Sequence, residues 1–111
     1  MDEHYLKLLK ELSQDHTLSQ RELSKKLGFS LGKVNYLVNA LLDKGLVKVE
    51  RFKNAKNKLA YTYLLTPSGI SMKANLTYNF LKRKIGEYDE LKLEIEELKK
   101  ELDLLRDGKQ L

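Results

Sequence analysis

The stretch LSQRELSKKLGFSLGKVNYLVNALLDKGL, residues 18–46, contains two helix starts separated by one tight turn. Ser19 and Glu22 have the S-x-x-E spacing of a capping box, in which each residue satisfies a backbone amide of the other. Gly28 suits the left-handed residue that ends a helix, and Ser30 can cap the next helix two residues later. Two short helices joined by a glycine-containing turn are the helix-turn-helix pattern.

The sequence on either side predicts the rest of a winged helix. Residues 3–13 place apolar side chains at helical spacing, which indicates a helix before the motif. Residues 46–52 and 59–65 are rich in β-branched and aromatic residues and flank a basic loop, which indicates a β-hairpin. Thr66 and Pro67 then supply a cap and a first helical residue for a long last helix. The expected fold class is mainly α with a small β-hairpin (α+β).

The domain organisation follows from this order of elements. We expect a winged helix-turn-helix DNA-binding domain over residues 1–66. A long helix over residues 67–106 should contain a parallel coiled-coil segment at about 81–105, and residues 107–111 should form a disordered tail.

Charge is distributed unevenly along the chain. Residues 1–80 hold 13 Lys and Arg against 7 Asp and Glu, a net charge of +6, whereas residues 81–111 hold 8 against 9, a net charge of −1. A basic front domain favours a polyanionic partner without proving one.

Several classes of protein are not expected from the composition. The chain has no cysteine, and its two histidines, His4 and His16, lie in separate segments without a set of carboxylates at ligand spacing. We therefore expect no metal, no cofactor and no enzymatic activity. No apolar run of about 18 residues and no signal peptide is present, so a cytoplasmic protein without membrane contact is expected.

The third helix must turn its apolar stripe inward, which leaves the opposite face for a partner. In helix-turn-helix proteins this helix enters the major groove, where Asn can pair with adenine and Lys can donate to guanine or phosphate. The candidate DNA-binding residues on this helix are Ser30, Gly32, Lys33, Asn35, Tyr36 and Asn39. The alternative is an ordinary solvated polar face.

The hairpin and the start of the second helix supply candidates for phosphate or minor-groove contacts. The wing candidates are Arg51, Lys53, Asn54, Lys56, Asn57 and Lys58. Ser19, Gln20 and Arg21 could contact phosphate at a helix N-terminus. A basic hairpin can also serve only to keep an edge strand soluble.

A heptad frame fits the chain from residue 81. Its seam positions include Leu81, Tyr88, Leu91, Ile95, Leu98, Leu102 and Leu105, and Lys84 is the one exception. A parallel pair would bring Glu87, Glu94 and Glu101 near Lys92, Lys99 and Arg106 of the partner, whereas an antiparallel pair would oppose like charges. A parallel homodimer is therefore expected, and a lone solvated helix is the alternative.

Residues 18–69 resemble the MarR family of bacterial regulators. The resemblance rests on LSQRELSKKLGFSLGKVNYLVNALLDKGLVKV and on Leu65-Thr66-Pro67-Ser68-Gly69, which is similar to the family's L-T-x-x-G ending. Within the family, the NYLVNALLDKGLV run and the KNAKNKLAYTYLLTP wing look like a subgroup linked to exopolysaccharide gene clusters. The resemblance implies DNA-reading roles for Gly32, Lys33, Asn35 and Tyr36 and a wing role for residues 53–58. The family's Asp-x-Arg in the wing is replaced by Asn54-Ala55-Lys56, and its extra N-terminal helix is missing, which speaks against a small-molecule effector.

The expected function is a sequence-specific transcriptional regulator that binds double-stranded DNA as a homodimer on an inverted repeat. The resemblance to the exopolysaccharide-associated subgroup implies polysaccharide genes as its targets. The alternative is a protein-interaction module in which the winged helix is a scaffold and the coil a docking arm. RNA binding ranks third, because no aromatic stacking platform is evident.

Overall fold

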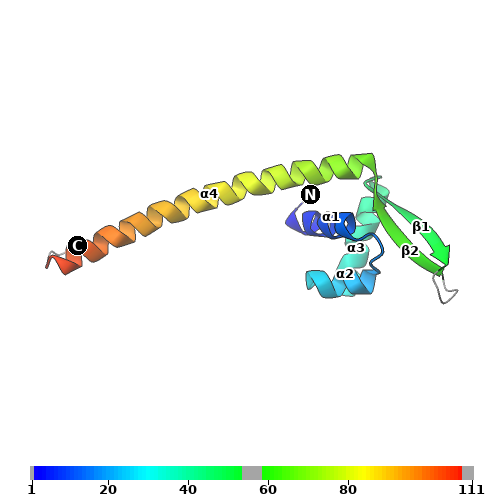
Figure 1. Cartoon of the computed structure of the whole chain (residues 1–111), viewed down its shortest axis with the longest axis horizontal. Helices are drawn as coiled ribbons and strands as arrows, with labels where there is room; N and C mark the ends of the chain where they lie inside the picture. The colour runs from blue at the N-terminus through cyan, green and yellow to red at the C-terminus, as the bar shows by residue number, and fades with distance from the viewer. Residues whose placement is uncertain (1, 54–58, 109–111) are drawn as a thin grey trace. The chain divides into compact units, whose positions relative to one another are not determined.

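The computed structural model describes residues 2–53 and 59–108 of the chain. Its elements follow in the order α1 (Glu3–Gln14), α2 (Gln20–Leu27), α3 (Leu31–Asp43), β1 (Val47–Lys53), β2 (Leu59–Leu65) and α4 (Pro67–Arg106) (Figure 1). The expected fold class, mainly helical with one small hairpin, is confirmed, and each element lies within about one residue of its expected range.

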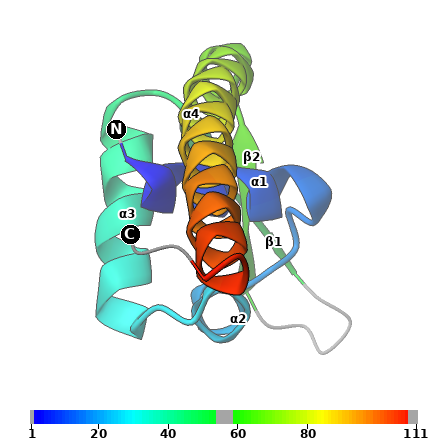
Figure 2. The same ribbon diagram turned by 90° about the vertical axis from the view of Figure 1, so that its left-hand side faces the viewer.

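Side-chain caps fix where the helices begin. Ser19 and Glu22 form the expected capping box at the start of α2, and Ser30 Oγ accepts from the Lys33 amide at the start of α3. Gly28 ends α2 with φ +69°, a left-handed conformation that glycine adopts without a steric penalty. The short turn between α2 and α3 is visible in Figure 2. The helix-turn-helix geometry is therefore determined by residues close together in sequence.

The two strands form an antiparallel hairpin in which Val47 pairs with Leu65 and Lys53 with Leu59. At the base of the hairpin, Val47 and Tyr63 are buried in the core. Alternate residues of a strand share a face, so Val49, Arg51 and Tyr61 lie on the same face as these two core residues.

One hydrophobic core joins the helices to the base of the hairpin. Its fully buried members are Leu8, Leu9, Leu12, Leu23, Val34, Val38 and Leu41. Met72 and Leu76 from the first turns of α4 pack against this core. For that reason the first compact unit runs from Met1 to Thr77, beyond the domain boundary expected after residue 66.

The second compact unit is Tyr78–Leu111. Every residue from 81 to 108 is exposed in the single chain. The backbone amides of Asp107 and Gly108 donate to the carbonyls of Asp103 and Leu105 and form a turn after α4. Residues 109–111, the remainder of the tail expected to be disordered, lie outside the described residues.

Of the helices in residues 2–53 and 59–108, none combines the length and the apolar character needed to cross a membrane.

Candidate nucleic-acid interface

The outer face of α3 is polar and open to solvent. Val34, Leu37, Val38 and Leu41 turn inward, and the exposed positions between them include Gly32, Asn35, Tyr36 and Asn39. The structure thus places these four predicted reading residues on one side of one helix. A Cβ added at Gly32 would meet no atom within 4 Å, so the free chain has no steric need for glycine there.

The start of α3 carries a positioned positive charge. Lys33 Nζ lies 4.3 Å from the centroid of the Phe29 ring, and the His4 ring lies 5.0 Å from the same ring on α1's side. A cation over an aromatic face is attracted to it. Lys33 is therefore half-buried beside its own helix N-terminus, where Ser30 serves as the cap. The sequence prediction missed Phe29, although its four-residue spacing from Lys33 was a usable signal.

Tyr36 is the most exposed large apolar side chain of the helix, at 69%. The hydroxyl group of Tyr36 interacts electrostatically with the hydroxyl group of Tyr5 in α1. Burial chiefly, and Tyr36 and Asp2 in addition, raise the pKa of the Tyr5 hydroxyl above its ordinary value of 10.0. Most of the Tyr36 ring is therefore available to a partner.

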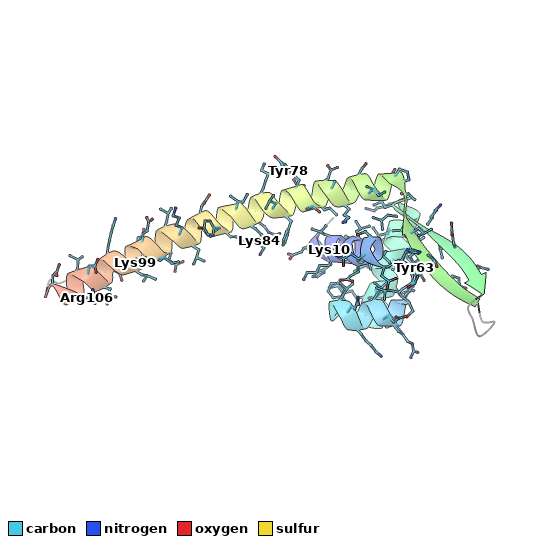
Figure 3. All side chains as sticks on the ribbon, viewed as in Figure 1. Lys10, Tyr63, Tyr78, Lys84, Lys99 and Arg106 are labelled. Atoms are coloured by element: carbon cyan, nitrogen blue, oxygen red, sulfur yellow. The ribbon has the colours of Figure 1, made fainter. Side chains whose placement is uncertain are left out.

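A line of side-chain hydrogen bonds connects three elements along this face. Asn39 Nδ2 donates to Asn35 Oδ1 at 3.1 Å, and Asn35 Nδ2 donates to Gln20 Oε1 at 3.2 Å. Gln20 Nε2 then donates to Tyr63 Oη at 3.1 Å. Tyr63, labelled in Figure 3, extends from β2 toward the helices and is 8% exposed. Sequence reasoning did not identify Tyr63, because its partner lies 43 residues away and no local pattern links them.

The three candidate phosphate contacts at the start of α2, Ser19, Gln20 and Arg21, differ in whether their side chains are already hydrogen-bonded within the chain. The Ser19 hydroxyl accepts from the Glu22 amide and is used as a cap. The Gln20 side chain is engaged by Tyr63 and Asn35, as described above. Arg21 is exposed at the first turn of α2, where the helix dipole already favours an anion.

The wing is described as far as Lys53 on one strand and from Leu59 on the other. The Arg51 guanidinium lies 5.6 Å from the centroid of the Tyr61 ring, directly across the hairpin. Lys53 ends β1, and the remaining predicted wing residues, Asn54, Lys56, Asn57 and Lys58, lie outside the described residues. Arg51 is thus the one wing candidate whose side chain the structure places.

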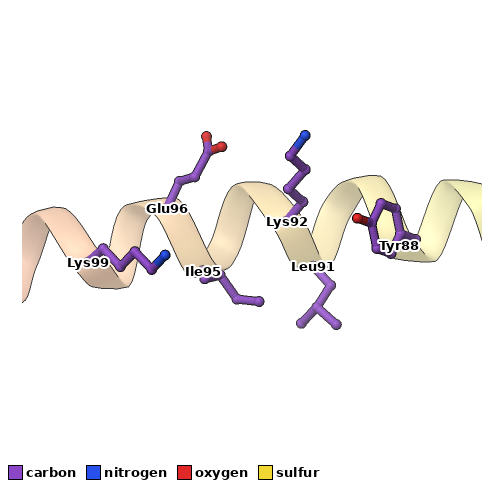
Figure 4. Close-up of a pocket in the computed structure, with 6 residues that line it drawn as sticks. All are labelled: Tyr88, Leu91, Lys92, Ile95, Glu96 and Lys99. Atoms are coloured by element: carbon purple, nitrogen blue, oxygen red, sulfur yellow. The ribbon is translucent and has the colours of Figure 1, made fainter.

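The far part of α4 presents an apolar stripe that nothing covers in the single chain. The expected seam residues are 44–65% exposed: Leu81, Tyr88, Leu91, Ile95, Leu98, Leu102 and Leu105. Figure 4 shows Leu91 and Ile95 extending from one side of the helix and Lys92 and Glu96 from the other. The stripe also includes Ile85, 51% exposed, which the prediction omitted. Its spacing from Leu81 and Tyr88 fills the gap that Lys84 leaves in the seam.

Glu87, which is expected to pair with the partner chain, already forms ion pairs within its own α4. Glu87 lies 3.1 Å from Lys84 Nζ and 3.7 Å from Arg83 Nε of its own chain. Such exposed pairs contribute about 0–1 kcal/mol each, so they compete weakly with a partner's Lys92. Within the described ranges, no three histidines, aspartates or glutamates come together in a way that could hold a metal ion.

Comparison with known proteins gives this geometry a context. Residues 1–48 match the family described as winged helix-turn-helix DNA-binding. The chain contains a winged helix-turn-helix domain. No curated protein matches the chain by sequence.

Several solved structures share this winged-helix fold, and they include MarR-family regulators. A MarR/EmrR family transcriptional regulator from Acinetobacter sp. ADP1 has a TM-score of 0.62 at 20% identity, over 93% of this chain and 77% of that one. MepR of Staphylococcus aureus, solved as a complex with DNA, has a TM-score of 0.61 at 26% identity, over 95% and 73%. PcaV from Streptomyces coelicolor, solved with its natural ligand, has a TM-score of 0.60 at 18% identity, over 97% and 74%. The chain therefore shares its fold with these regulators.

Proposed function

We propose that the chain is a MarR-type transcriptional regulator that binds double-stranded DNA as a homodimer. The observation that carries the proposal is the outer face of α3, where Gly32, Asn35, Tyr36 and Asn39 are exposed and Lys33 is half-buried beside them. These side chains have the donors and acceptors that base edges in a major groove require. The DNA complex of MepR, which shares the fold, supports the same assignment.

In this proposal α3 lies in the major groove of the DNA, and the β1–β2 hairpin lies along the neighbouring sugar-phosphate backbone. Arg51 is held over Tyr61 on the hairpin face that continues from the core, and the sequence between the two strands contains the further basic residues Lys56 and Lys58. Arg21 and the start of α2 contact phosphate. The contacts from α3 supply sequence preference, and those from the wing supply salt-dependent affinity.

The second half of the proposal concerns α4. Seven exposed apolar residues at heptad spacing would be buried by a second copy of the same helix. Glu94 and Glu101 favour a parallel partner, which brings both α3 helices to the same end of the coil. Such a dimer requires two half-sites related by a twofold axis, that is, an inverted repeat.

The regulated genes follow only from resemblance. The wing and the NYLVNALLDKGLV run look like those of the exopolysaccharide-associated subgroup, so promoters of exopolysaccharide gene clusters are the first DNA to test. Cytoplasmic location is inferred on the same basis, because such a regulator acts where its DNA is.

The test is selection of bound duplexes from a random pool by the purified chain, followed by anisotropy titration across salt. We expect one enriched inverted repeat and an affinity that falls steeply and linearly in a log–log plot of salt. Lys33→Ala with Asn35→Ala should reduce the preference for that repeat, whereas Lys56→Ala with Lys58→Ala should weaken binding to all duplexes alike. No enriched sequence, or an affinity indifferent to salt, would overturn the proposal.

A protein-interaction module is the second candidate, because two leucines of α4 lie outside the heptad seam. Leu93 is 62% exposed and Leu104 is 36% exposed. That function requires a stable hetero-complex that survives mutation of α3, and it requires no retention of the chain on DNA.

A further inference from the structure

The hydrogen-bonded line from β2 through α2 to α3 has one buried end and one exposed end. Tyr63 anchors it in the core, Gln20 is half-buried, and Asn35 and Asn39 are exposed on the outer face of α3. Hydrogen bonds between exposed amides contribute little on their own, because water competes for both partners. Tyr63, which is 8% exposed, is therefore the member of the line that is best shielded from competing water.

All donors in the line face the same way. Each carboxamide nitrogen donates inward, from Asn39 to Asn35, from Asn35 to Gln20, and from Gln20 to Tyr63. Asn39 Oδ1 stands at the outer end, and among residues 2–53 and 59–108 it has no donor. Both asparagines keep a second N–H for a partner. The direction of the bonds thus determines which side of each amide offers an acceptor and which offers a donor.

We propose that Tyr63 and Gln20 are positioning residues that hold the carboxamide groups of Asn35 and Asn39 in place on α3, and so favour A·T pairs beneath this helix. A correctly oriented asparagine offers an acceptor to adenine N6–H and a donor to adenine N7, a pair of bonds that other bases do not match. A carboxamide that is not held in the line can rotate, and it then presents its donor and its acceptor in exchanged positions for part of the time. The inference rests on the proposed DNA-binding function and adds the residues that set its specificity.

Two substitutions break the line at different points without removing a DNA-facing group of α3. Tyr63→Phe deletes only the hydroxyl that accepts from Gln20 and keeps the ring in the core. Gln20→Met keeps the length of the side chain and deletes the bonds to both neighbours. Tyr78→Phe, on the exposed part of α4, is the matched control that also loses one tyrosine hydroxyl.

The binding experiment compares each variant on the selected duplex, on that duplex with single A·T pairs changed to G·C, and on an unrelated duplex. We expect Tyr63→Phe to weaken binding to the selected duplex by about 2- to 10-fold, with unrelated DNA and the salt slope unchanged. Because Gln20 is also a candidate phosphate contact, Gln20→Met is read from the ratio of its affinities for the selected and the unrelated duplex, which should fall by the same factor of about 2 to 10. The penalty for changing A·T to G·C should shrink by the same factor. The double variant should lose no more than Gln20→Met alone, because both changes break one line.

A second measurement needs no DNA. The side-chain amide NMR signals of Asn35 and Asn39 should shift in Tyr63→Phe, although these two residues are linked to Tyr63 only through Gln20 in the line of hydrogen bonds, and should not shift in Tyr78→Phe. Unshifted signals, or unchanged selectivity in both variants while wild type binds selectively, would overturn the positioning role and leave the proposed function standing. A wild-type chain that binds no duplex would overturn both.

Discussion

Thr66 and Gly69 show how two residues join the hairpin to the last helix. Thr66 Oγ1 donates to the Gly45 carbonyl at 2.6 Å and accepts from the Gly69 amide at 3.1 Å, so it ties the end of α3 to the start of α4. Gly69 lies directly against the Leu46 carbonyl, in a space that a Cβ would fill. The L-T-x-x-G ending therefore has a packing role that its resemblance to a family alone did not explain.

Replacing Gly69 by alanine should destabilise the domain by about 1–3 kcal/mol, because the new methyl group would push α4 away from Leu46. Gly86→Ala is the control, since Gly86 lies in the same helix and a Cβ there meets nothing within 4 Å. That substitution should be neutral or stabilising by up to about 1 kcal/mol. Urea unfolding of both variants checks the prediction, and equal effects at the two positions would contradict it.

Gly32 should behave in the opposite way to Gly69. Its exposed position in α3 has room for a methyl group, so Gly32→Ala should raise the free energy of unfolding by roughly 0.5–1 kcal/mol through better helix propensity. If the glycine is there to admit DNA, the same variant should bind the selected duplex more weakly. Thermal unfolding and anisotropy of one preparation give both values; a variant that is more stable and binds equally well would remove the functional reason for this glycine.

At the scale of helices and strands, the sequence predicted interactions between residues close together in the chain and missed those between distant residues. The starts of α2, α3 and α4 depend on Ser19, Ser30 and Thr66, each of which bonds to an amide three residues ahead. Such caps can be recognised locally, and the helix bounds followed from them. The bond between Gln20 and Tyr63 joins two elements through their packing. Its geometry depends on the hairpin register, which no local pattern specified, and so it was missed.

The candidate site shows the same division. The inward stripe of α3 was predictable from periodicity, and it left Asn35, Tyr36 and Asn39 exposed as expected. That the Lys33 ammonium lies over Phe29, and that Gln20 is engaged by Asn35, depend on rotamers and on contacts between elements. The sequence therefore predicted which residues face outward but not what holds them in place.

For α4, heptad position rather than exposure should decide which leucines matter. Leu98 and Leu93 are 55% and 62% exposed in the single chain, yet only Leu98 lies on the seam. Leu98→Lys should dissociate the dimer, since losing a buried leucine costs about 2–5 kcal/mol in each protomer, whereas Leu93→Lys should leave it intact. Sedimentation equilibrium distinguishes the two. A dimer that survives Leu98→Lys but not Leu93→Lys would place the interface on the other side of the helix.

At the scale of the whole molecule, the proposed DNA-binding and pairing functions lie in different parts of the chain. Residues 1–80 carry the excess positive charge and the polar face of α3, and the described residues from 81 onward carry an uncovered apolar stripe with balanced charge. A basic surface attracts DNA from solution without selecting a sequence. Pairing of two such domains adds selectivity, because both half-sites must be present at one spacing.

The number of protein chains bound to one DNA duplex tests the proposed DNA binding and the proposed pairing together. Native mass spectrometry of the full chain with its selected duplex, at a protein concentration sufficient for binding, counts them directly. We predict two chains on each duplex that carries the intact inverted repeat. We predict no bound chain when one half-site is scrambled. A single chain bound with equal affinity to the intact and the half-scrambled duplex would contradict it.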